Sequence, residues 1–197
     1  MPRKTSREGL MAAATDIFFE KGFHGALVSE IVAAAGVSQG TFYQYFASKE
    51  AAFVEIINQF ADELRAVVAS VYPETMESAE QYQRDFGEAY RVAFQLVADR
   101  RRAASLLLQQ APFVGGEAAE TRRSLIDEME AVTQVYLSQG IDKGFLRGFD
   151  VPIIARAVIG LLMHTFARTI IEEGQTVDLD VVADEILRFE LTGTTAN

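Results

Sequence analysis

A run of uncharged polar side chains between residues 38 and 45 has the chemistry to bind a nucleic-acid duplex. A glutamine amide carries a donor and an acceptor that together match the adenine edge in the major groove. Hydroxyl groups bond phosphate oxygens and so fix a protein's position on the duplex. Gln39 and Gln44 are therefore the expected base readers, directly or through water. The other polar side chains of the run are those of Ser38, Thr41, Tyr43 and Tyr45.

Two short helices joined by a glycine turn would position this run. The apolar spacing predicts one helix over 28–35 and a second, capped by Ser38, that ends near Phe46. Gly36 can adopt the left-handed conformation that a tight turn between helices requires. Phe42 and Phe46 are expected in the core. The pattern indicates a helix-turn-helix whose second helix enters a major groove.

The segment IVAAAGVSQGTFYQYFASKE, residues 31–50, resembles the DNA-binding end of the TetR-type (TetR/AcrR, tetracycline-repressor-like) family. A second stretch, GIDKGFLRGFDVPIIARAVIGL over 140–161, resembles the part that joins the ligand pocket to the first dimerisation helix. The resemblance implies an all-α fold of about nine helices. A three-helix helix-turn-helix domain would occupy 1–50, and a larger effector-binding and dimerisation domain would occupy 51–197.

The resemblance also implies which residues contact DNA. Arg3, Lys4 and Arg7 would form an arm on the backbone or in the minor groove, although such cations also suit a solubilising N-terminus. Lys49 matches the family's phosphate-binding lysine, and Tyr43 is similarly placed. The predicted DNA-binding set is Arg3, Lys4, Arg7, Ser38, Gln39, Gly40, Thr41, Tyr43, Gln44, Tyr45 and Lys49.

The sequence departs from the family's pattern at the start of the second helix. The family usually has Thr or Ser there, which caps the helix and contacts phosphate, whereas this chain has Ala26 and Leu27. Either Ser29 substitutes as the cap or the phosphate contact is absent. Tyr45 stands where the family often has His, and it either faces DNA or packs inward.

Charge is distributed unevenly along the chain. Residues 1–50 carry as many Lys and Arg as Asp and Glu, while the whole chain has 18 basic and 28 acidic residues, a net charge of −10. All the excess acid therefore lies beyond residue 50. This asymmetry permits an N-terminal end that faces DNA and a body that repels it.

Apolar residues recur at helical spacing through the body and predict its elements. Aromatic and methionine side chains there suit an adaptable apolar cavity, although for each of them ordinary helix packing is the alternative. His164 would bond a ligand or be a satisfied core or interface histidine. The predicted helices cover 48–73, 79–100, 101–110, 117–139, 150–173 and 179–191, with a loop at 112–116 and a connector over 140–148. The tentative ligand-binding set is Phe86, Tyr90, Phe94, Met129, Tyr136, Met163 and His164.

The predicted helix over 150–173 is apolar nearly all round from 151 to 171, which a helix on one small body does not need. Burial between two subunits explains this composition, with 179–191 as its partner in a homodimer, and burial within one chain is the alternative. Arg156 interrupts the apolar run, which favours a buried helix over a membrane span. The N-terminus lacks an apolar secretory stretch, so we expect a cytoplasmic protein without a membrane partner.

These features favour a ligand-responsive transcriptional regulator. The leading hypothesis is a repressor that leaves a palindromic operator when a small lipophilic effector binds the C-terminal domain; activation, and a carrier with a degenerate helix-turn-helix, stay open. Enzymatic function is not expected, because the sequence has no G-x-S-x-G elbow, phosphate-cradling loop, HExxH or cysteine. With two histidines and no cysteine, no metal site is expected, and no cofactor is expected either.

Overall fold

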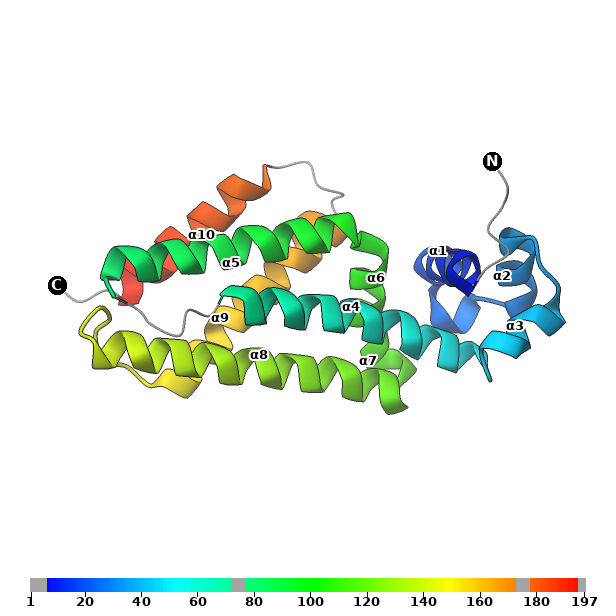
Figure 1. Ribbon diagram of the computed structural model, residues 1–197, viewed down its shortest axis with the longest axis horizontal. Helices are drawn as coiled ribbons and strands as arrows, with labels where there is room; N and C mark the ends of the chain where they lie inside the picture. The colour runs from blue at the N-terminus through cyan, green and yellow to red at the C-terminus, as the bar shows by residue number, and fades with distance from the viewer. Residues whose placement is uncertain (1–6, 72–76, 173–177, 195–197) are drawn as a thin grey trace. The chain divides into compact units, whose positions relative to one another are not determined.

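The computed structural model describes residues 7–71, 77–172 and 178–194 as an assembly of helices (Figure 1). The described residues contain no β-strand, which confirms the predicted all-α class. The elements are α1 (Arg7–Gly25), α2 (Val28–Ala35), α3 (Gln39–Tyr45), α4 (Lys49–Val71), α5 (Ala79–Asp99), α6 (Arg101–Ser105), the π-helical turns η1 (Leu106–Gln110) and η2 (Phe166–Glu172), α7 (Ala111–Val114), α8 (Gly116–Asp142), α9 (Val151–Thr165) and α10 (Leu179–Thr194). The described residues form nine helices, as predicted, when segments that directly follow one another (α6, η1 and α7; α9 and η2) are counted as one helix each.

The chain forms two compact units. Unit 1 combines Met1–Asp62 with Arg100–Arg122, and unit 2 combines Glu63–Asp99 with Arg123–Asn197. Helices α4 and α8 therefore each begin in unit 1 and end in unit 2. The predicted boundary at residue 50 separates a DNA-binding domain from an effector-binding and dimerisation domain. This division by function stays a prediction.

The turn between α2 and α3 has the predicted geometry. Gly36 adopts φ 71° and ψ 33°, the left-handed conformation that is open to glycine, and it ends α2. The amide of Val37 then donates to the carbonyl of Val32 at 3.0 Å, which satisfies a group at the helix end. The Ser38 hydroxyl accepts from the amide of Thr41 at 3.2 Å, so the predicted cap of α3 is confirmed.

Aromatic side chains form the core of unit 1. Phe18, Phe42 and Phe53 are fully buried, and Phe46 is nearly so. The Phe18 and Phe53 rings meet edge to face, with their centroids 5.3 Å apart. The prediction that Phe42 and Phe46 lie inside is confirmed.

Helix α1 is interrupted at Gly22. Gly22 has φ 72° and ψ 160°, and the chain continues for one further turn to Gly25. Gln110, at the end of η1, spans the interruption with both ends of its amide. Its Nε2 donates to the Phe18 carbonyl at 3.1 Å, and its Oε1 accepts from the Phe23 amide at 3.1 Å. The broken helix ladder thus obtains replacement hydrogen bonds from a residue far along the chain.

The loop predicted over 112–116 is wrong in its first part. Helix α7 occupies Ala111–Val114, with Pro112 in its first turn, where a proline ring is pre-organised for the helix and its missing amide costs nothing. The chain changes direction at Gly115, which has φ 78°. A single helical turn is too short to produce an apolar period that the sequence could reveal.

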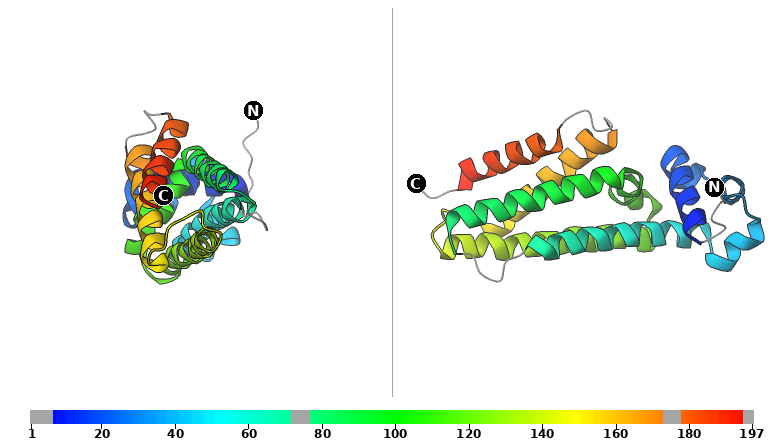
Figure 2. Two further views of the ribbon diagram at one scale, coloured as in Figure 1. Left: turned by 90° about the vertical axis from the view of Figure 1, so that its left-hand side faces the viewer. Right: turned by 45° about the horizontal axis from the view of Figure 1, so that its top comes forward.

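Unit 2 is built from four long helices and the second half of α4. Helix α10 lies along α5 in both Figures 1 and 2. Tyr82 of α5 and Tyr136 of α8 pack with ring centroids 4.9 Å apart in a cluster that includes Ala155 of α9. Asp150 caps α9 as predicted, because its carboxylate accepts from the Ile153 amide at 3.1 Å.

The Gln110 contacts generate a prediction about stability. Gln110→Ala should lower the free energy of unfolding by about 1–3 kcal/mol, since it removes two part-buried hydrogen bonds, one from the Phe23 amide and one to the Phe18 carbonyl. Urea denaturation measures the effect. Gln95→Ala is the matched control, because the Gln95 side chain bonds Asp99 at an exposed position. Equal losses in the two variants would contradict the special role of Gln110.

Candidate functional site

The outer face of α3 presents the polar side chains that the sequence singles out. Gln39 and Gln44 are exposed, and Tyr43 and Tyr45 are 52% and 43% exposed. The alternative that Tyr45 packs inward is therefore wrong in this structure. Ser38 and Gly40 are also exposed, and Thr41 is half-buried, with its hydroxyl 2.9 Å from that of Ser38. The structure thus brings the 38–45 run together on one accessible surface.

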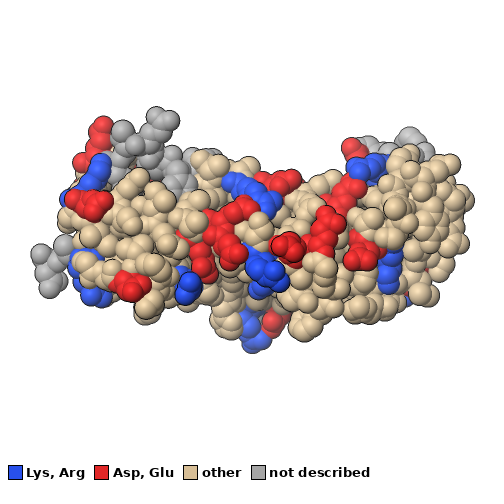
Figure 3. All heavy atoms as spheres, turned by 90° about the horizontal axis from the view of Figure 1, so that it is seen from below, with Lys and Arg blue, Asp and Glu red and all other residues tan. Residues whose placement is uncertain are grey.

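This surface is uncharged. Helix α3 has no ionisable acid or base other than its two tyrosines, and α2 contributes Glu30 alone. Figure 3 shows one face of the molecule, on which few charged side chains lie over the end that carries α2 and α3. Contacts made by this helix would be hydrogen bonds and not ion pairs.

The start of α2 is capped by a carboxylate instead of a hydroxyl. Leu27 occupies the cap position and Ser29 does not serve as the cap, so that expectation is wrong. Glu30 reaches back and accepts from the Leu27 amide at 3.2 Å, and it also pairs with Lys21. The Lys21 hydrogen bond, and then the Leu27 amide, hold the pKa of Glu30 below its ordinary value. The carboxylate thus makes one of the two bonds of a capping box, while the Glu30 amide, which a Ser or Thr hydroxyl at position 27 would accept from, bonds the Leu27 carbonyl at 3.0 Å.

Lys49 is tied to the end of α1. Its ammonium donates to the carbonyls of Phe23 and Ala26 at 2.7 and 2.9 Å and lies 4.5 Å from the Phe23 ring centroid. An ammonium has three N–H groups, so these two bonds leave one for a phosphate oxygen. The sequence does not foresee this internal role, and the predicted phosphate contact stays a prediction.

The predicted N-terminal arm is described in part. Arg7 pairs with Glu55 of α4, and its guanidinium lies 5.7 Å from the Phe46 ring centroid. Arg7 thus packs on unit 1 while its side chain stays half exposed. Arg3 and Lys4 lie outside the described residues.

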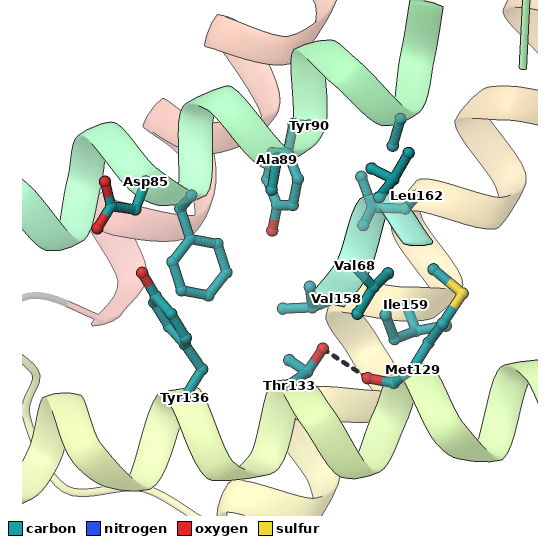
Figure 4. A pocket seen from close by; sticks show the side chains of 13 residues that line it. Val68, Asp85, Ala89, Tyr90, Met129, Thr133, Tyr136, Val158, Ile159 and Leu162 are labelled. Carbon is teal, nitrogen blue, oxygen red and sulfur yellow. Dashed lines mark hydrogen bonds between the residues drawn. The ribbon is translucent and has the colours of Figure 1, made fainter. Parts of the chain in front are cut away.

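Unit 2 contains a cavity of about 70 Å³ among α4, α5, α8 and α9 (Figure 4). Four members of the predicted ligand-binding set line it: Phe86, Tyr90, Met129 and Tyr136. Phe86 also lines a neighbouring open groove of about 820 Å³ beside α10. The apolar lining with a few polar groups is typical of small-molecule sites.

The other three members of that set lie elsewhere. Phe94 is fully buried and packs on Phe166, with ring centroids 4.6 Å apart. Met163 is half-buried and His164 is exposed, and neither lines the cavity. Phe94 is therefore a packing residue in this structure, which is the alternative that the sequence analysis gave for it.

Sequence reasoning overlooked Asp85 and Thr133 as lining residues. Thr133 lies at helical spacing between Met129 and Tyr136, which the sequence singled out, and Asp85 directly precedes Phe86. A polar residue on an apolar helix face is the signal that would have found them. Thr133 donates its hydroxyl to the Met129 carbonyl at 2.8 Å, the bond drawn in Figure 4.

Glu190 of α10 lies next to the cavity lining. Tyr90 donates its hydroxyl to Glu190 Oε2 at 2.5 Å. Burial raises the pKa of Glu190 to about 7, and the Tyr90 hydrogen bond opposes that rise. The carboxyl is therefore partly protonated near neutral pH.

The helix-turn-helix and the sequence around it match a known family. The family model for bacterial regulatory proteins of the tetR family matches residues 10–56, which span α2, α3 and the start of α4. The chain is 29% identical over 180 residues to the HTH-type transcriptional regulator YdgC of Bacillus subtilis, covering 90% of this chain and 89% of that protein. The chain belongs to the TetR family of transcriptional regulators.

Two further comparisons bear on this TetR-family chain. It is 37% identical over 79 residues to the transcriptional repressor DhaR of Mycobacterium, covering 40% of this chain and 38% of that protein. It superimposes on the FadR regulator of B. subtilis, solved in complex with stearoyl-CoA, with a TM-score of 0.73 and 20% identity. That match covers 95% of this chain and 99% of FadR and establishes the likeness of fold.

Among the described residues no group of three or more His, Asp or Glu side chains is placed to hold a metal ion. The stretch Val151–Glu172 is long and apolar enough to cross a membrane by length and composition alone, the one such helix in the part of the chain that is described. Core helices pass the same test, and Arg156 lies within this stretch.

Glu190 generates a prediction about pH. Its folded-state pKa lies above the unfolded value of about 4.5, so its contribution to stability is complete below pH 4.5 and is lost as pH rises through about 7. The free energy of unfolding of Glu190→Gln, relative to that of the unaltered chain, should therefore be higher at pH 8 than at pH 4.5, by a difference on the order of 2–3 kcal/mol. Thermal unfolding at the two pH values measures this difference. The exposed Glu185→Gln on the same helix is the control, and the same pH response in both variants would refute the assignment.

Proposed function

We propose that this TetR-family chain is a repressor that leaves a palindromic operator when a small lipophilic effector binds unit 2. The observation that carries the proposal is the exposed uncharged face of α3, held by a buried Phe42 and a capped turn. The likeness to the repressor DhaR supports repression, and the stearoyl-CoA in the FadR structure supports an effector with a long apolar chain. The cavity of unit 2 would be the place where the effector first binds.

A homodimer would present two copies of α3 to successive major grooves, about 34 Å apart. An exposed stripe on α9 supports this arrangement, because Ile153, Ala157, Gly160 and His164 recur at helical spacing and Ile153 is 61% exposed. The small residues would let a second helix approach closely. On α10, Val181 and Phe189 also expose large apolar side chains. Burial of these surfaces between subunits accounts for their composition better than exposure to water in the cytoplasm.

The effector signal would travel through helices that continue from one unit into the other. The chain passes from unit 1 into unit 2 within α4, after Asp62, and returns to unit 1 between α5 and α6. Within unit 1, Arg102 of α6 pairs with Asp16 of α1 at 2.7 Å, and Gln110 bonds both sides of the Gly22 interruption. A displacement of α4 or α5 would therefore be passed to the helix-turn-helix. Linkage requires DNA to weaken effector binding by the same factor.

The DNA contacts generate a prediction with two variants that serve as controls for each other. Gln44→Ala should relax base preference at one operator position, with a loss of about 1–3 kcal/mol for the preferred site. Lys49→Ala should weaken all DNA sequences alike and reduce the slope of log affinity against log salt by about 1. Selection from a random duplex pool, followed by titration at several salt concentrations, measures both effects. Failure of the unaltered chain to enrich any sequence would refute the proposed function.

The proposed dimer generates a further prediction. Phe189→Asp should weaken dimerisation at least about tenfold, because it places a carboxylate in an apolar interface. Sedimentation velocity over a range of concentrations measures the dissociation constant. Phe113→Asp is the control, since Phe113 of α7 is 79% exposed and lies in unit 1. If Phe189→Asp leaves the dimer as tight as Phe113→Asp does, the α10 surface is not part of the interface.

A further inference from the structure

The cavity of unit 2 contains one charged group among many apolar ones. Carbon-rich side chains supply most of its surface, among them Val68, Met129 and Leu162. Among the described residues that line it, Asp85 is the only one with a charged side chain. A carboxylate is an unusual component of an apolar cavity, because removal from water disfavours its charge unless a partner compensates.

Asp85 lacks such a partner for one of its oxygens. Its Oδ2 is buried and makes no hydrogen bond within the part of the chain that the structure describes. An ionised carboxylate is purely an acceptor, so only a donor can satisfy this oxygen. No lysine or arginine lines the cavity to supply one from the described residues.

Two other hydroxyl groups of the cavity lining donate elsewhere and not to Asp85. Tyr90 directs its hydroxyl proton to Glu190, and Thr133 directs its own to the Met129 carbonyl. Figure 4 shows the Asp85 carboxylate and the Tyr136 hydroxyl toward one end of the cavity, and Met129, Ile159 and Leu162 toward the other. The cavity thus has a polar end and an apolar end.

The size of the cavity limits what it holds without rearrangement. Its volume of about 70 Å³ is roughly half that of a cavity of about 150 Å³ known to admit benzene. Phe86 lines both this cavity and the larger open groove of about 820 Å³. A rotation of the Phe86 ring would join the two spaces, so that a longer apolar body could extend from the polar end into the groove.

We propose that Asp85 selects the effector by its head group: an apolar molecule whose hydrogen-bond-donating end, an ammonium or a hydroxyl, binds Asp85 Oδ2. An ammonium is favoured over a hydroxyl, because it neutralises the buried charge and makes the stronger charge-assisted bond. An anionic head group is excluded from this end by repulsion. The inference rests on the proposed function in one respect, that this cavity is the effector site.

Isothermal titration calorimetry with three probes of equal length tests the assignment. Hexylamine, hexan-1-ol and hexanoate differ in head group, and at pH 7 they are cationic, neutral and anionic. The unaltered chain should bind the amine most tightly, then the alcohol, then the carboxylate. Asp85→Asn should reduce the preference for amine over alcohol at least about tenfold and should improve hexanoate binding.

One further variant and one further readout make the test specific. Asp127→Asn makes the same chemical change at an exposed position of α8 and should leave the ranking unaltered. Asp85→Asn should also raise the melting temperature of the unliganded protein, which reports that the variant folds. The assignment is overturned if hexanoate binds best, if the amine preference survives in Asp85→Asn, or if none of the three probes binds.

An operator-release assay separates this inference from the proposed function. A chain that binds hexylamine in the calorimeter yet stays on its DNA would contradict effector-driven release and leave the Asp85 assignment intact. A chain that hexanoate releases from DNA as readily as hexylamine does would contradict the Asp85 assignment and leave the proposed function intact.

Discussion

The burial of the Phe42 side chain fixes which residues of α3 face outward. A seven-residue helix has too little surface to be held by many contacts, so one fully buried ring and one capped turn must set its rotation. With Phe42 inside, Tyr43 and Gln44 are turned about 100° and 200° away from the core, because a helix turns by about 100° per residue. Gln39 lies nearer the Phe42 side of the helix and is exposed in the first turn. Every proposed base contact depends on this rotation.

The helix-turn-helix is supported by a segment that comes much later in the chain. Gln110 completes the hydrogen bonding of α1 at its interruption, and Lys49 and Glu30 satisfy other exposed backbone groups in the same unit. Several polar side chains that look available for DNA or solvent therefore hold the helix ends together. Lys49 bonds backbone carbonyls and is also proposed to contact phosphate, so it would link the stability of the unit to its affinity for DNA.

Unit 2 combines apolar packing with a small number of buried polar groups. In the Tyr90–Glu190 pair, burial has raised the pKa of the carboxyl to about 7 and a hydroxyl bonds one of its oxygens, Oε2. Asp85 Oδ2 has no such bond within the described residues. An apolar cavity with one unmatched acceptor distinguishes ligands by their head groups more sharply than by their bodies, because an unmade buried hydrogen bond costs more than a missing methylene group.

The sequence by itself determined the helix-turn-helix, because its signals are local. Gly36, Ser38 and the polar run act within a few residues of one another, and so do the Asp150 cap and the spacing of Phe86, Tyr90, Met129 and Tyr136. The tertiary structure alone decided the internal bonds of Lys49, the long-range role of Gln110, the burial of Phe94 against Phe166 and the isolation of Asp85. Each of these depends on which helix faces come together. That choice is made by packing between residues far apart in the chain, and no local pattern encodes it.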